Sequence, residues 1–569
     1  MSRTQRRAIA PAVGATTAAL LALAGTAAAN APGPYTVHRI ASVGALRTAA
    51  VGDDLFFTNP SRPELWKSDG TTAGTVMVKS WSAGPDGADA IANLTALDGM
   101  LLFTSVDPEG RTELWRSDGT TAGTTVVSHV DLGPASGERN ELTAMDGAVF
   151  FSAADDVHGS ELWRSDGTDD GTALVKDLYP GPGSGEPRHL TVVTDTLFFK
   201  SLDEDGEGEA LWTSDGTTAG TVLVSRLPVD GTNADDPRQF VAAGDRLFFT
   251  AQDEFNDREL WTSDGTTEGT VLVKDIDPGG YHYYGDNGGP QNLVAIGHAL
   301  YFTASDEVHG RELWRSDGTA EGTVMVADIR PGADTSFPYD LTVSHKALFF
   351  AADDGTHGRE LWRSDGTAAG TTMVRDINPR GTRAHRIGPT ELAEADGTLF
   401  FTADDGVHGS DIWASDGTRA GTVLVDDTAP GDEDVRAYGA VEAGGTVFFR
   451  TAGRDARYSL WTIGGPPQCH GLTATMKGAG TIVGTRHRDV IVGSAGDDVI
   501  RGRGGDDVIC AGGGEDSVIG GAGEDVARGG RGKDHLDLRD GVRHNDRGDG
   551  GPGRDTGRRD RGDSFESVP

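Results

Sequence analysis

A tryptophan recurs nine times along this chain, each time within nearly the same short segment. The clearest copies read ELWRSDGT, as in residues 113–120 and 360–367. Successive tryptophans are 48 to 53 residues apart. A nearly constant period of this size indicates one structural unit repeated in series. The nine residues are Trp66, Trp115, Trp163, Trp212, Trp261, Trp314, Trp362, Trp413 and Trp461.

One repeat contains four segments that each have the pattern of a short β-strand. In residues 341–377 these segments are LTVSH, ALFFAA, RELWRS and TTMVRDI. LFF and ELW place apolar residues side by side, so both faces of these strands must be covered. Four antiparallel strands in such a repeat match a blade of a β-propeller, which lies between two neighbouring blades. We therefore predict that the tryptophan packs between blades; stacking on a ligand is the alternative.

The number of strands indicates how the ring closes. Nine third strands of ELW type are followed by only eight fourth strands, because the last repeat stops at residues 459–467. An unmatched strand-like segment, YTVHRI at residues 35–40, precedes the first complete repeat. We predict that it supplies the missing strand and closes an all-β propeller of about nine blades within residues 30–467. An open solenoid is the alternative.

Beyond residue 468 the composition changes to glycine-rich units of nine residues, which span 484–537. The sixth residue of each unit is Asp, the fourth is Gly in the last five units, and the eighth is apolar in most of them. Glycine permits tight turns with positive φ, and Asp supplies the hard oxygen that Ca²⁺ prefers. The pattern predicts a short parallel β-roll that binds Ca²⁺ as its cofactor; an acidic, disordered segment is the alternative. The predicted metal-site residues are Asp489, Asp498, Asp507, Asp516, Asp525, Asp534, Gly496, Gly505, Gly514 and Gly523.

The first of these units departs from the pattern, because His487 stands where Gly is expected. A complete site in that unit is therefore in doubt. We place the β-roll at residues 468–540. Residues 541–569 are rich in Arg, Asp and Gly, and this composition predicts a disordered tail.

The N-terminal segment, the cysteines and the net charge bear on location and partners. Residues 1–29 combine basic residues, an apolar stretch and a small-residue cleavage pattern, which predicts a secretion signal; a retained membrane anchor is the alternative. The chain has two cysteines, Cys469 and Cys510, which favour one disulfide in an exported protein; two unrelated thiols are the alternative. The formal net charge of −38 argues against nucleic acid or an anionic membrane as a partner.

The predicted propeller offers candidate ligand contacts but no recognisable catalytic set. The longest connection between blades contains Tyr281, Tyr283 and Tyr284, which we propose as contacts for a glycan or protein; packing of the loop on itself is the alternative. The second turns of several repeats combine acids with histidine, as in DDVHGSE at 155–161, and predict a turn cap or a metal site. We expect a non-catalytic binding or adhesion module; a polysaccharide-active hydrolase or lyase is the alternative.

Both parts of the chain resemble known repeat families. The tryptophan units resemble the ELWxxDGT (hyalin-like) repeats of secreted bacterial proteins, which implies an extracellular propeller-like protein with no settled enzymatic activity. The nine-residue units resemble the repeats-in-toxin, or haemolysin-type, calcium-binding β-roll. Residues 469–485 are similar to the start of such modules in actinobacterial secreted proteins, which implies that Cys510 is the partner of Cys469.

Overall fold

The computed structural model describes most of the chain between residues 36 and 566. It leaves out residues 43–46, 60, 73, 82–90, 108–109, 134–140, 204–208, 227–236, 253–257, 278–288, 307, 345, 380–387, 396, 427–435, 453–457, 465–467, 470–471, 474–475, 478–480, 494–496, 543–544, 552–553 and 562. The predicted secretion signal, the tyrosines at 281, 283 and 284, and Gly496 therefore lie outside the described residues. In the part that is described, no helix has the length and hydropathy that crossing a membrane requires.

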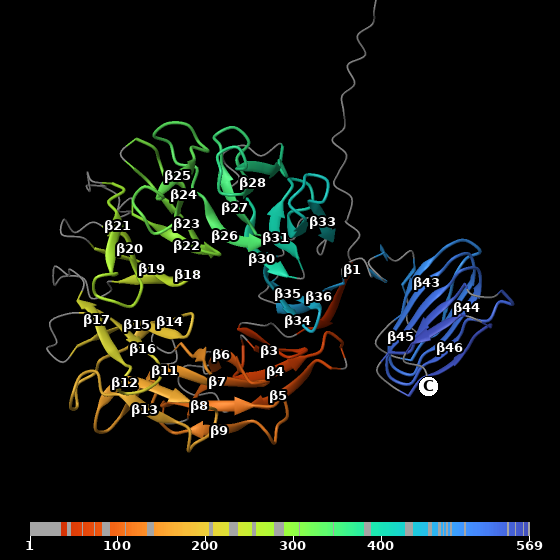
Figure 1. Cartoon of the computed structure of the whole chain (residues 1–569), viewed down its shortest axis with the longest axis horizontal. Coiled ribbons are helices and arrows are strands. Elements are labelled where there is room, and N and C mark those ends of the chain that lie inside the picture. Colours follow the sequence, from red (N-terminus) through yellow and green to blue (C-terminus); the bar gives the residue numbers. More distant parts are fainter. Residues whose placement is uncertain are drawn as a thin grey trace, which may run out of the picture.

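Nine four-stranded antiparallel sheets form a ring, which confirms the predicted propeller and its number of blades (Figure 1). The first strands are β2 (Thr48–Val51), β6 (Ile91–Leu97), β10 (Thr143–Met145), β14 (Arg188–Val193), β18 (Arg238–Ala243), β22 (Gln291–Ile296), β26 (Tyr339–Ser344), β30 (Thr390–Ala395) and β34 (Arg436–Ala443). The second strands are β3 (Asp54–Thr58), β7 (Met100–Val106), β11 (Ala148–Asp155), β15 (Thr196–Leu202), β19 (Arg246–Gln252), β23 (Ala299–Ala304), β27 (Ala347–Asp353), β31 (Thr398–Asp404) and β35 (Thr446–Ala452).

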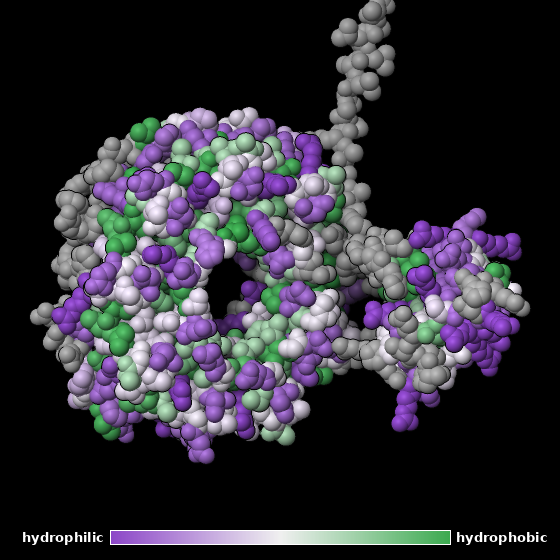
Figure 2. Space-filling view, in the orientation of Figure 1, coloured by the Kyte–Doolittle hydropathy of each residue, from purple (hydrophilic) through white to green (hydrophobic). Residues whose placement is uncertain are grey.

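The third strands carry the tryptophans. They are β4 (Glu64–Ser68), β8 (Thr112–Ser117), β12 (Gly159–Ser165), β16 (Glu209–Ser214), β20 (Arg258–Ser263), β24 (Glu312–Ser316), β28 (Arg359–Ser364), β32 (Ser410–Ser415) and β36 (Tyr458–Gly464). The fourth strands are β5 (Val76–Ser80), β9 (Thr125–Ser128), β13 (Ala173–Lys176), β17 (Val222–Arg226), β21 (Val271–Lys274), β25 (Val324–Ala327), β29 (Thr372–Arg375), β33 (Val423–Asp426) and, in the ninth blade, β1 (Thr36–Ala41). First strands of successive blades lie beside one another around the central opening that Figure 2 shows.

The ring closes through the two ends of the propeller sequence. β1 pairs antiparallel with β36, so that Arg39 lies opposite Trp461 and Val37 opposite Ile463. The ninth sheet therefore has the strand order β1-β36-β35-β34, as the count of strand-like segments predicts. Closure in this way satisfies the backbone of β36, which would otherwise present an unpaired edge.

Consecutive apolar residues of a strand face different neighbouring blades. Phe56 packs in one core cluster with Leu101 and Phe103 of the second blade, whereas Phe57 packs with Phe448 and Leu460 of the ninth blade. The tryptophans belong to these same clusters, each stacked beside the phenylalanine across the sheet in seven blades, as for Phe57 and Trp66. The predicted role of the tryptophan in packing between blades is confirmed.

The chain then forms a parallel β-solenoid, the predicted β-roll, after a short hairpin of β37 (Gln468–Cys469) and β38 (Leu472–Thr473). One sheet has six strands: β39 (Met476–Lys477), β41 (Val490–Val492), β43 (Val508–Gly513), β45 (Val526–Arg531), β47 (Arg547–Asp549) and β49 (Ser564–Glu566). The opposite sheet has five: β40 (Thr481–Val483), β42 (Val499–Gly504), β44 (Ser517–Ala522), β46 (His535–Asp537) and β48 (Thr556–Arg558).

The prediction of a disordered tail from residue 541 is wrong. β47, β48 and β49 continue the two sheets in parallel register as far as Glu566. Glycine replaces the inward apolar residue at Gly548 and Gly557, which hides the repeat in the sequence. Phe565 fills the resulting space, because a Cβ on Gly548 would lie 2.9 Å from its ring, and it packs against the apolar core of the solenoid.

Candidate calcium-binding site

Glycines at the fourth position of the units shape the turns of the solenoid. The φ angles of Gly505, Gly514 and Gly523 are 100°, 105° and 142°, in the region that side chains disfavour. A Cβ on Gly523 would lie 2.2 Å from the carbonyl oxygen of Gly505 in the turn beneath it. Glycine is therefore required both for the turn and for the close stacking of successive turns. The apolar eighth residues complete the core, since Ile491, Ile500, Ile509, Val518, Ala527 and Leu536 are at most 1 % exposed.

The predicted aspartates form two buried rows, one along each edge of the solenoid. Asp489, Asp498, Asp507, Asp516, Asp525 and Asp534 are each no more than 5 % exposed. Oδ1 of each aspartate from Asp507 onward accepts the backbone N–H of the aspartate one turn earlier in its own row. For example, the N–H of Asp489 donates to Asp507 over 2.8 Å, and the N–H of Asp507 donates to Asp525 over 3.0 Å. One carboxylate oxygen is thus used to hold successive turns in register.

The second carboxylate oxygen has no hydrogen-bond donor in six aspartates of these rows. Oδ2 is buried and unpartnered in Asp507, Asp516, Asp525, Asp534, Asp546 and Asp555. Burial raises the pKa of Asp507, Asp516 and Asp525 to about 6, and neighbouring aspartates add to the effect. A row of buried carboxylates that lack donors disfavours the ionised, cation-free solenoid.

Backbone carbonyls converge on these unpartnered oxygens. A Cβ on Gly502 would stand 2.3 Å from Oδ2 of Asp507 and 2.4 Å from the carbonyl oxygen of Gly520. The same arrangement occurs at Gly529, beside Asp534 and the carbonyl of Gly550. Carboxylate and carbonyl oxygens at one small space are the ligands of Ca²⁺. The residues therefore fit calcium, which would be held by the two aspartate rows and the carbonyls of the adjoining turns.

The first unit differs from the others, in keeping with His487 at its fourth position. Oδ2 of Asp489 accepts hydrogen bonds from the N–H of Thr485 over 2.6 Å and from its hydroxyl over 2.9 Å. Thr485 thus supplies donors to the oxygen that is unpartnered in the units of Asp507, Asp516, Asp525 and Asp534. Asp489 lies in the row, but its Oδ2 already accepts hydrogen bonds within the protein.

The aspartate rows extend further than the sequence analysis predicted. The N–H groups of Asp525 and Asp534 donate to Asp546 and Asp555 over 2.9 Å, although these partners lie 21 rather than 18 residues ahead. Asp546, Asp555 and Asp563 are at most 5 % exposed. The signal was present as Gly550-Gly551 followed by Asp555, but three extra residues before Asp546 shift the register.

A disulfide closes the beginning of the solenoid, which confirms the predicted pair. Cys469 of β37 bonds to Cys510 of β43, with Cα atoms 5.6 Å apart. Cys469 packs against Val490 and Val508 on the outer face of the six-stranded sheet. The hairpin is thereby fixed across that face.

The acid and histidine residues in the second turns of the propeller are turn caps. Asp155 accepts the N–H groups of Val157 and His158, and His158 Nδ1 lies 2.8 Å from the same carboxylate. Asp306 with His309, Asp354 with His357 and Asp405 with His408 repeat this pattern. The backbone N–H groups of the histidines in these three turns donate to the same aspartates. The structure therefore favours the cap over a propeller metal site.

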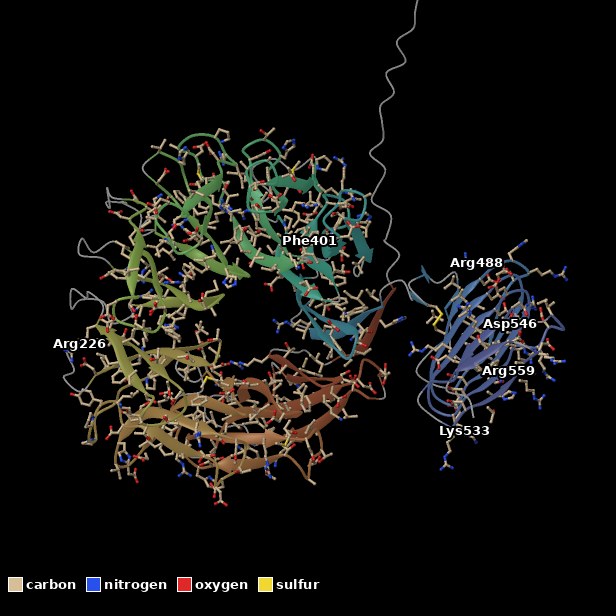
Figure 3. All side chains as sticks on the ribbon, viewed as in Figure 1. Arg226, Phe401, Arg488, Lys533, Asp546 and Arg559 are labelled. Carbon is tan, nitrogen blue, oxygen red and sulfur yellow. A yellow bond between two sulfur atoms is a disulfide. The ribbon has the colours of Figure 1, made fainter. Side chains whose placement is uncertain are left out.

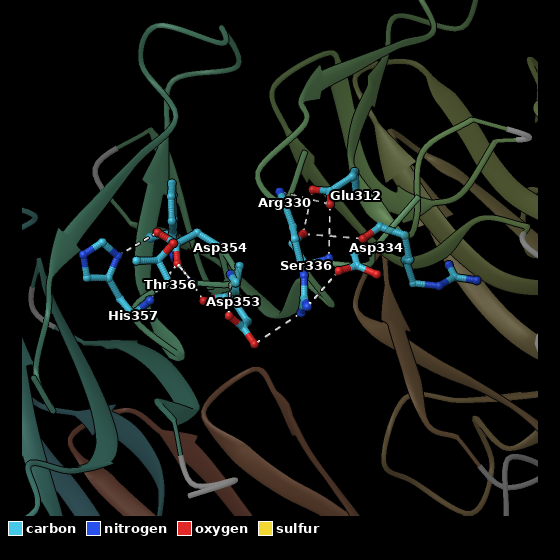
Figure 4. Close-up of polar contacts among 12 residues, drawn as sticks. Glu312, Arg330, Asp334, Ser336, Asp353, Asp354, Thr356 and His357 are labelled. Carbon is cyan, nitrogen blue, oxygen red and sulfur yellow. Dashed lines mark hydrogen bonds and ion pairs between the residues drawn. The ribbon is translucent and has the colours of Figure 1, made fainter. Parts of the chain in front are cut away.

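The glutamate of the ELW segment joins one blade to the next, a role that sequence reasoning missed. Figure 4 shows Glu312, whose carboxylate accepts the N–H of Ile329 and both the N–H and hydroxyl of Ser336. The carbonyl of Ser336 accepts the N–H of Asp353 in the following blade. Burial raises the pKa of Glu161 and Glu312 to about 7 and that of Glu360 to about 8.

The SDGT segments form turns that are held by hydrogen bonds of their own Asp and Thr side chains. Asp118 accepts the N–H and hydroxyl of Thr120, and the hydroxyl of Thr120 accepts the N–H of Gly123. These hydrogen bonds hold the pKa of Asp118 below its usual value. Lys79 of the preceding blade donates to the carbonyl of Thr124 and lies over Trp115. The repeated Asp and Thr side chains of these turns therefore stabilise the fold.

Comparison with known proteins identifies the repeats of the solenoid. Residues 483–518 and 511–542 match the RTX calcium-binding nonapeptide repeat. The matched segments contain all six predicted aspartates and end before Asp546. Among curated proteins, none matches this sequence. RTX repeats bind calcium and are typical of secreted proteins, which supports Ca²⁺ as the cation of the solenoid.

Solved structures with distant similarity to this chain include a peptidase, a hydrolase and the propeller domain of a protease. Dipeptidyl peptidase 4 of Porphyromonas gingivalis is 11% identical over 79% of this chain and 68% of its own, with a TM-score of 0.41. A puromycin hydrolase is 14% identical with a TM-score of 0.31, and this chain spans 61% of its length. The propeller domain of the Trilobed protease from Pyrococcus furiosus gives 9% identity and a TM-score of 0.32, over 65% of this chain and 94% of that domain. Likeness at this level carries no inference about activity.

Proposed function

We propose that this chain is a secreted, calcium-binding repeat protein whose propeller is a non-catalytic module for a glycan or protein ligand. Calcium would fold and stiffen the solenoid at the carboxyl end. The N-terminal signal pattern of residues 1–29 and the RTX repeats both favour an extracellular location. The resemblance of the propeller units to ELWxxDGT repeats favours the same location.

The observation that carries this proposal is the pair of aspartate rows with unpartnered oxygens. Six buried carboxylates each keep one oxygen without a donor. Repulsion between turns opposes folding while the carboxylates are charged and no cation is present. A divalent cation between turns would replace that repulsion with coordination, so calcium binding and folding of the solenoid are coupled.

The non-catalytic assignment of the propeller is supported by how its repeated acids are used. Glu161, Glu312 and Glu360 accept backbone N–H groups of the connections between blades. The aspartates of the SDGT segments accept hydrogen bonds from N–H and hydroxyl groups within their own turns. These carboxylates are committed to the fold, and the same arrangement recurs around the ring rather than at one place.

Calcium titration of the mature protein tests the proposal. Far-ultraviolet circular dichroism should gain β-structure with calcium, and isothermal titration calorimetry should detect several ions for each chain. Magnesium at the same concentration is the control, since its strict octahedral preference suits carbonyl-rich turns poorly. A spectrum that is the same in calcium and in chelator would overturn the assignment.

The ligand of the propeller is tested separately, on a glycan array and with extracellular matrix proteins. The variant Tyr281→Ala, Tyr283→Ala, Tyr284→Ala should lose binding if the long connection forms the contact surface. Retention of full binding in this variant would remove that connection from the proposal. Turnover of a polysaccharide on the array would replace the binding module with an enzyme.

A further inference from the structure

The solenoid changes the sign of its charge along its length. Residues 489–525 contain two basic and nine acidic residues, a formal net charge of −7. Residues 528–563 contain ten basic and eight acidic residues, a net charge of +2. The whole chain carries −38. The C-terminal part of the solenoid is thus a locally cationic region on a strongly anionic protein.

Burial separates the two signs of charge in this region. The basic side chains described between 528 and 563 are all exposed, namely Arg528, Lys533, Arg539, Arg547, Arg554, Arg558, Arg559 and Arg561. Four of the eight acids, Asp534, Asp546, Asp555 and Asp563, are buried in the inner rows. The other four are half-buried, and the surface that solvent meets is therefore dominated by arginine and lysine.

The half-buried acids are also committed to partners. Asp537 accepts two hydrogen bonds from Arg539, at 2.8 and 2.7 Å. Asp540 accepts the N–H of Val542, Asp549 that of Gly551, and Asp560 those of Asp540 and Gly541. Arg539 and Arg528 form ion pairs with Asp537 and Asp549, and the charge of Arg558 also acts on Asp537.

Three of these cations form what we call the cationic strip: Lys533, Arg554 and Arg558. Lys533 and Arg554 precede β46 and β48, whose residues His535 and Thr556 are register partners, so the two lie on one edge in adjacent turns. Arg558 lies at the other end of β48, opposite Asp537. The equivalent positions in the earlier turns are Asp497 and Glu515. None of the three makes a salt bridge within the described part of the chain, and Lys533 projects from the solenoid in Figure 3.

Bound calcium would make the electrostatic potential at the cationic strip more positive. The four inner aspartates of residues 528–563 supply half of the negative charge of that region. Each bound Ca²⁺ adds two positive charges beside them and leaves the exposed cations unchanged. This step rests on the calcium binding proposed above.

We propose that the cationic strip and the exposed arginines around it bind an anionic polysaccharide, through its carboxylate or sulfate groups, and that calcium strengthens the binding. Guanidinium and ammonium groups recognise such anions, and arginine does so with paired hydrogen bonds. A flexible polysaccharide can follow a strip one edge wide. A stiff duplex nucleic acid would meet the repulsion of the remaining chain, which carries −40 outside residues 528–563.

Biolayer interferometry of the mature protein against immobilised polymers tests the proposal. Dextran sulfate and hyaluronate probe sulfate and carboxylate, neutral dextran is the blank, and duplex DNA probes the alternative macromolecule. Calcium and chelator are compared for each polymer. We expect binding to one or both anionic polysaccharides in calcium, weakened at least about tenfold by high salt.

The variant Lys533→Gln, Arg554→Gln, Arg558→Gln should weaken this binding at least about tenfold. Its matched control is Arg486→Gln, Arg488→Gln, Arg501→Gln, which makes the same change in net charge with exposed residues at the other end of the solenoid. Calorimetry should show that both variants keep the calcium stoichiometry of the parent protein.

Each other outcome overturns the inference. Equal losses in the two variants would mean that net charge alone acts, and equal or tighter binding of DNA would make the surface a nucleic-acid site. Normal calcium binding without any polysaccharide binding would remove the inference and leave the proposed function standing. Polysaccharide binding that is the same in calcium and chelator, in a chain that binds no calcium, would instead refute the proposed function and the calcium step.

Discussion

Six aspartates in the inner rows of the solenoid use their two carboxylate oxygens in different ways. Oδ1 of Asp525 accepts the N–H of Asp507, whereas Oδ2 has no donor. A Cβ on Gly520 would lie 2.5 Å from that second oxygen, so it faces the turn of its own unit. Oδ1 serves folding, whereas Oδ2 is available to bind the cation. A substitution that changes only Oδ2 therefore tests the two functions separately.

The variant Asp525→Asn makes that separation. The amide oxygen still accepts the N–H of Asp507, and the amide nitrogen gives a donor where the carboxylate left an unpartnered oxygen. We expect calorimetry to show at least one fewer calcium ion per chain and the calcium needed for half-folding to rise about tenfold.

Circular dichroism in chelator provides the control for this variant. Because the substitution removes a buried charge, the variant should hold at least as much β-structure without calcium as the parent protein does. A variant that binds calcium with unchanged stoichiometry and affinity would exclude Asp525 from the ligands.

The buried glutamates of the propeller predict a pH dependence of its stability. Folding raises the pKa of Glu360 from an ordinary value near 4.5 to about 8. The folded state thus holds the proton more tightly, so this contribution to stability is complete below about pH 4.5 and is lost as the pH rises towards 8. The melting temperature of the propeller should therefore fall between these values, as measured by tryptophan fluorescence in saturating calcium.

Glu360→Gln tests the origin of that pH dependence. Because burial also raises the pKa of Glu161, Glu312 and Asp340, removal of one titrating group should reduce the slope without abolishing it. The loss of one acceptor for Ile377 and Asn378 adds a cost that does not vary with pH. An unchanged slope would assign the pH dependence to other groups.

Residues that recur at a fixed spacing could be identified from the sequence, whereas residues that do not recur could not. The six aspartates at nine-residue intervals were identified, whereas Asp546 escaped because an insertion changes the interval. The role of Glu312 was invisible for a different reason: its partner Ser336 lies 24 residues away in a variable connection. Spacing reveals a repeated site, but not which backbone a buried side chain contacts.

Among the strands, β1 closes the ring by joining the first and last blades. Ile40 of β1 is 6 % exposed and packs with Leu55, Phe57 and Leu460. Ile40→Ala should destabilise the propeller by about 2 kcal/mol or more, because it leaves a cavity where the first and last blades meet. Urea unfolding followed by tryptophan fluorescence measures this loss.

His38→Ala is the matched control for that change. His38 lies two residues away on the same strand with an exposed side chain, and its backbone carbonyl, which accepts the hydroxyl of Thr462, is retained. We expect a change within about 0.5 kcal/mol of the parent protein. Equal effects of the two substitutions would show that side-chain packing at β1 does not hold the ring closed.

The elements themselves were largely predictable, and the exceptions have a physical cause. Alternation and paired apolar residues defined four strands in each repeat, and counting them predicted the strand order of the ninth sheet. β47 and β48 were missed because their inward positions are Gly548 and Gly557. A strand whose inward residue has no side chain keeps its hydrogen bonds but loses the apolar pattern by which a strand is recognised in a sequence.

The whole molecule contains two folding units that respond to different conditions. All ten tryptophans lie between residues 66 and 461, in the propeller, and the solenoid has none. We therefore predict that chelation of calcium reduces the β-structure seen by circular dichroism while tryptophan emission stays the same. A shift of the tryptophan emission on chelation would mean that the solenoid supports the propeller.

The pairing of β1 with β36 also has a consequence for the order of events during synthesis. Among the propeller strands, β1 is made before all the others but can pair only after β36 has been made, since Arg39 lies opposite Trp461. Eight blades can assemble while β1 is still unpaired. The ninth blade forms only after more than four hundred further residues are made. A chain cut short before β36 therefore leaves the two ends of the incomplete ring exposed. This exposure distinguishes it from the complete protein.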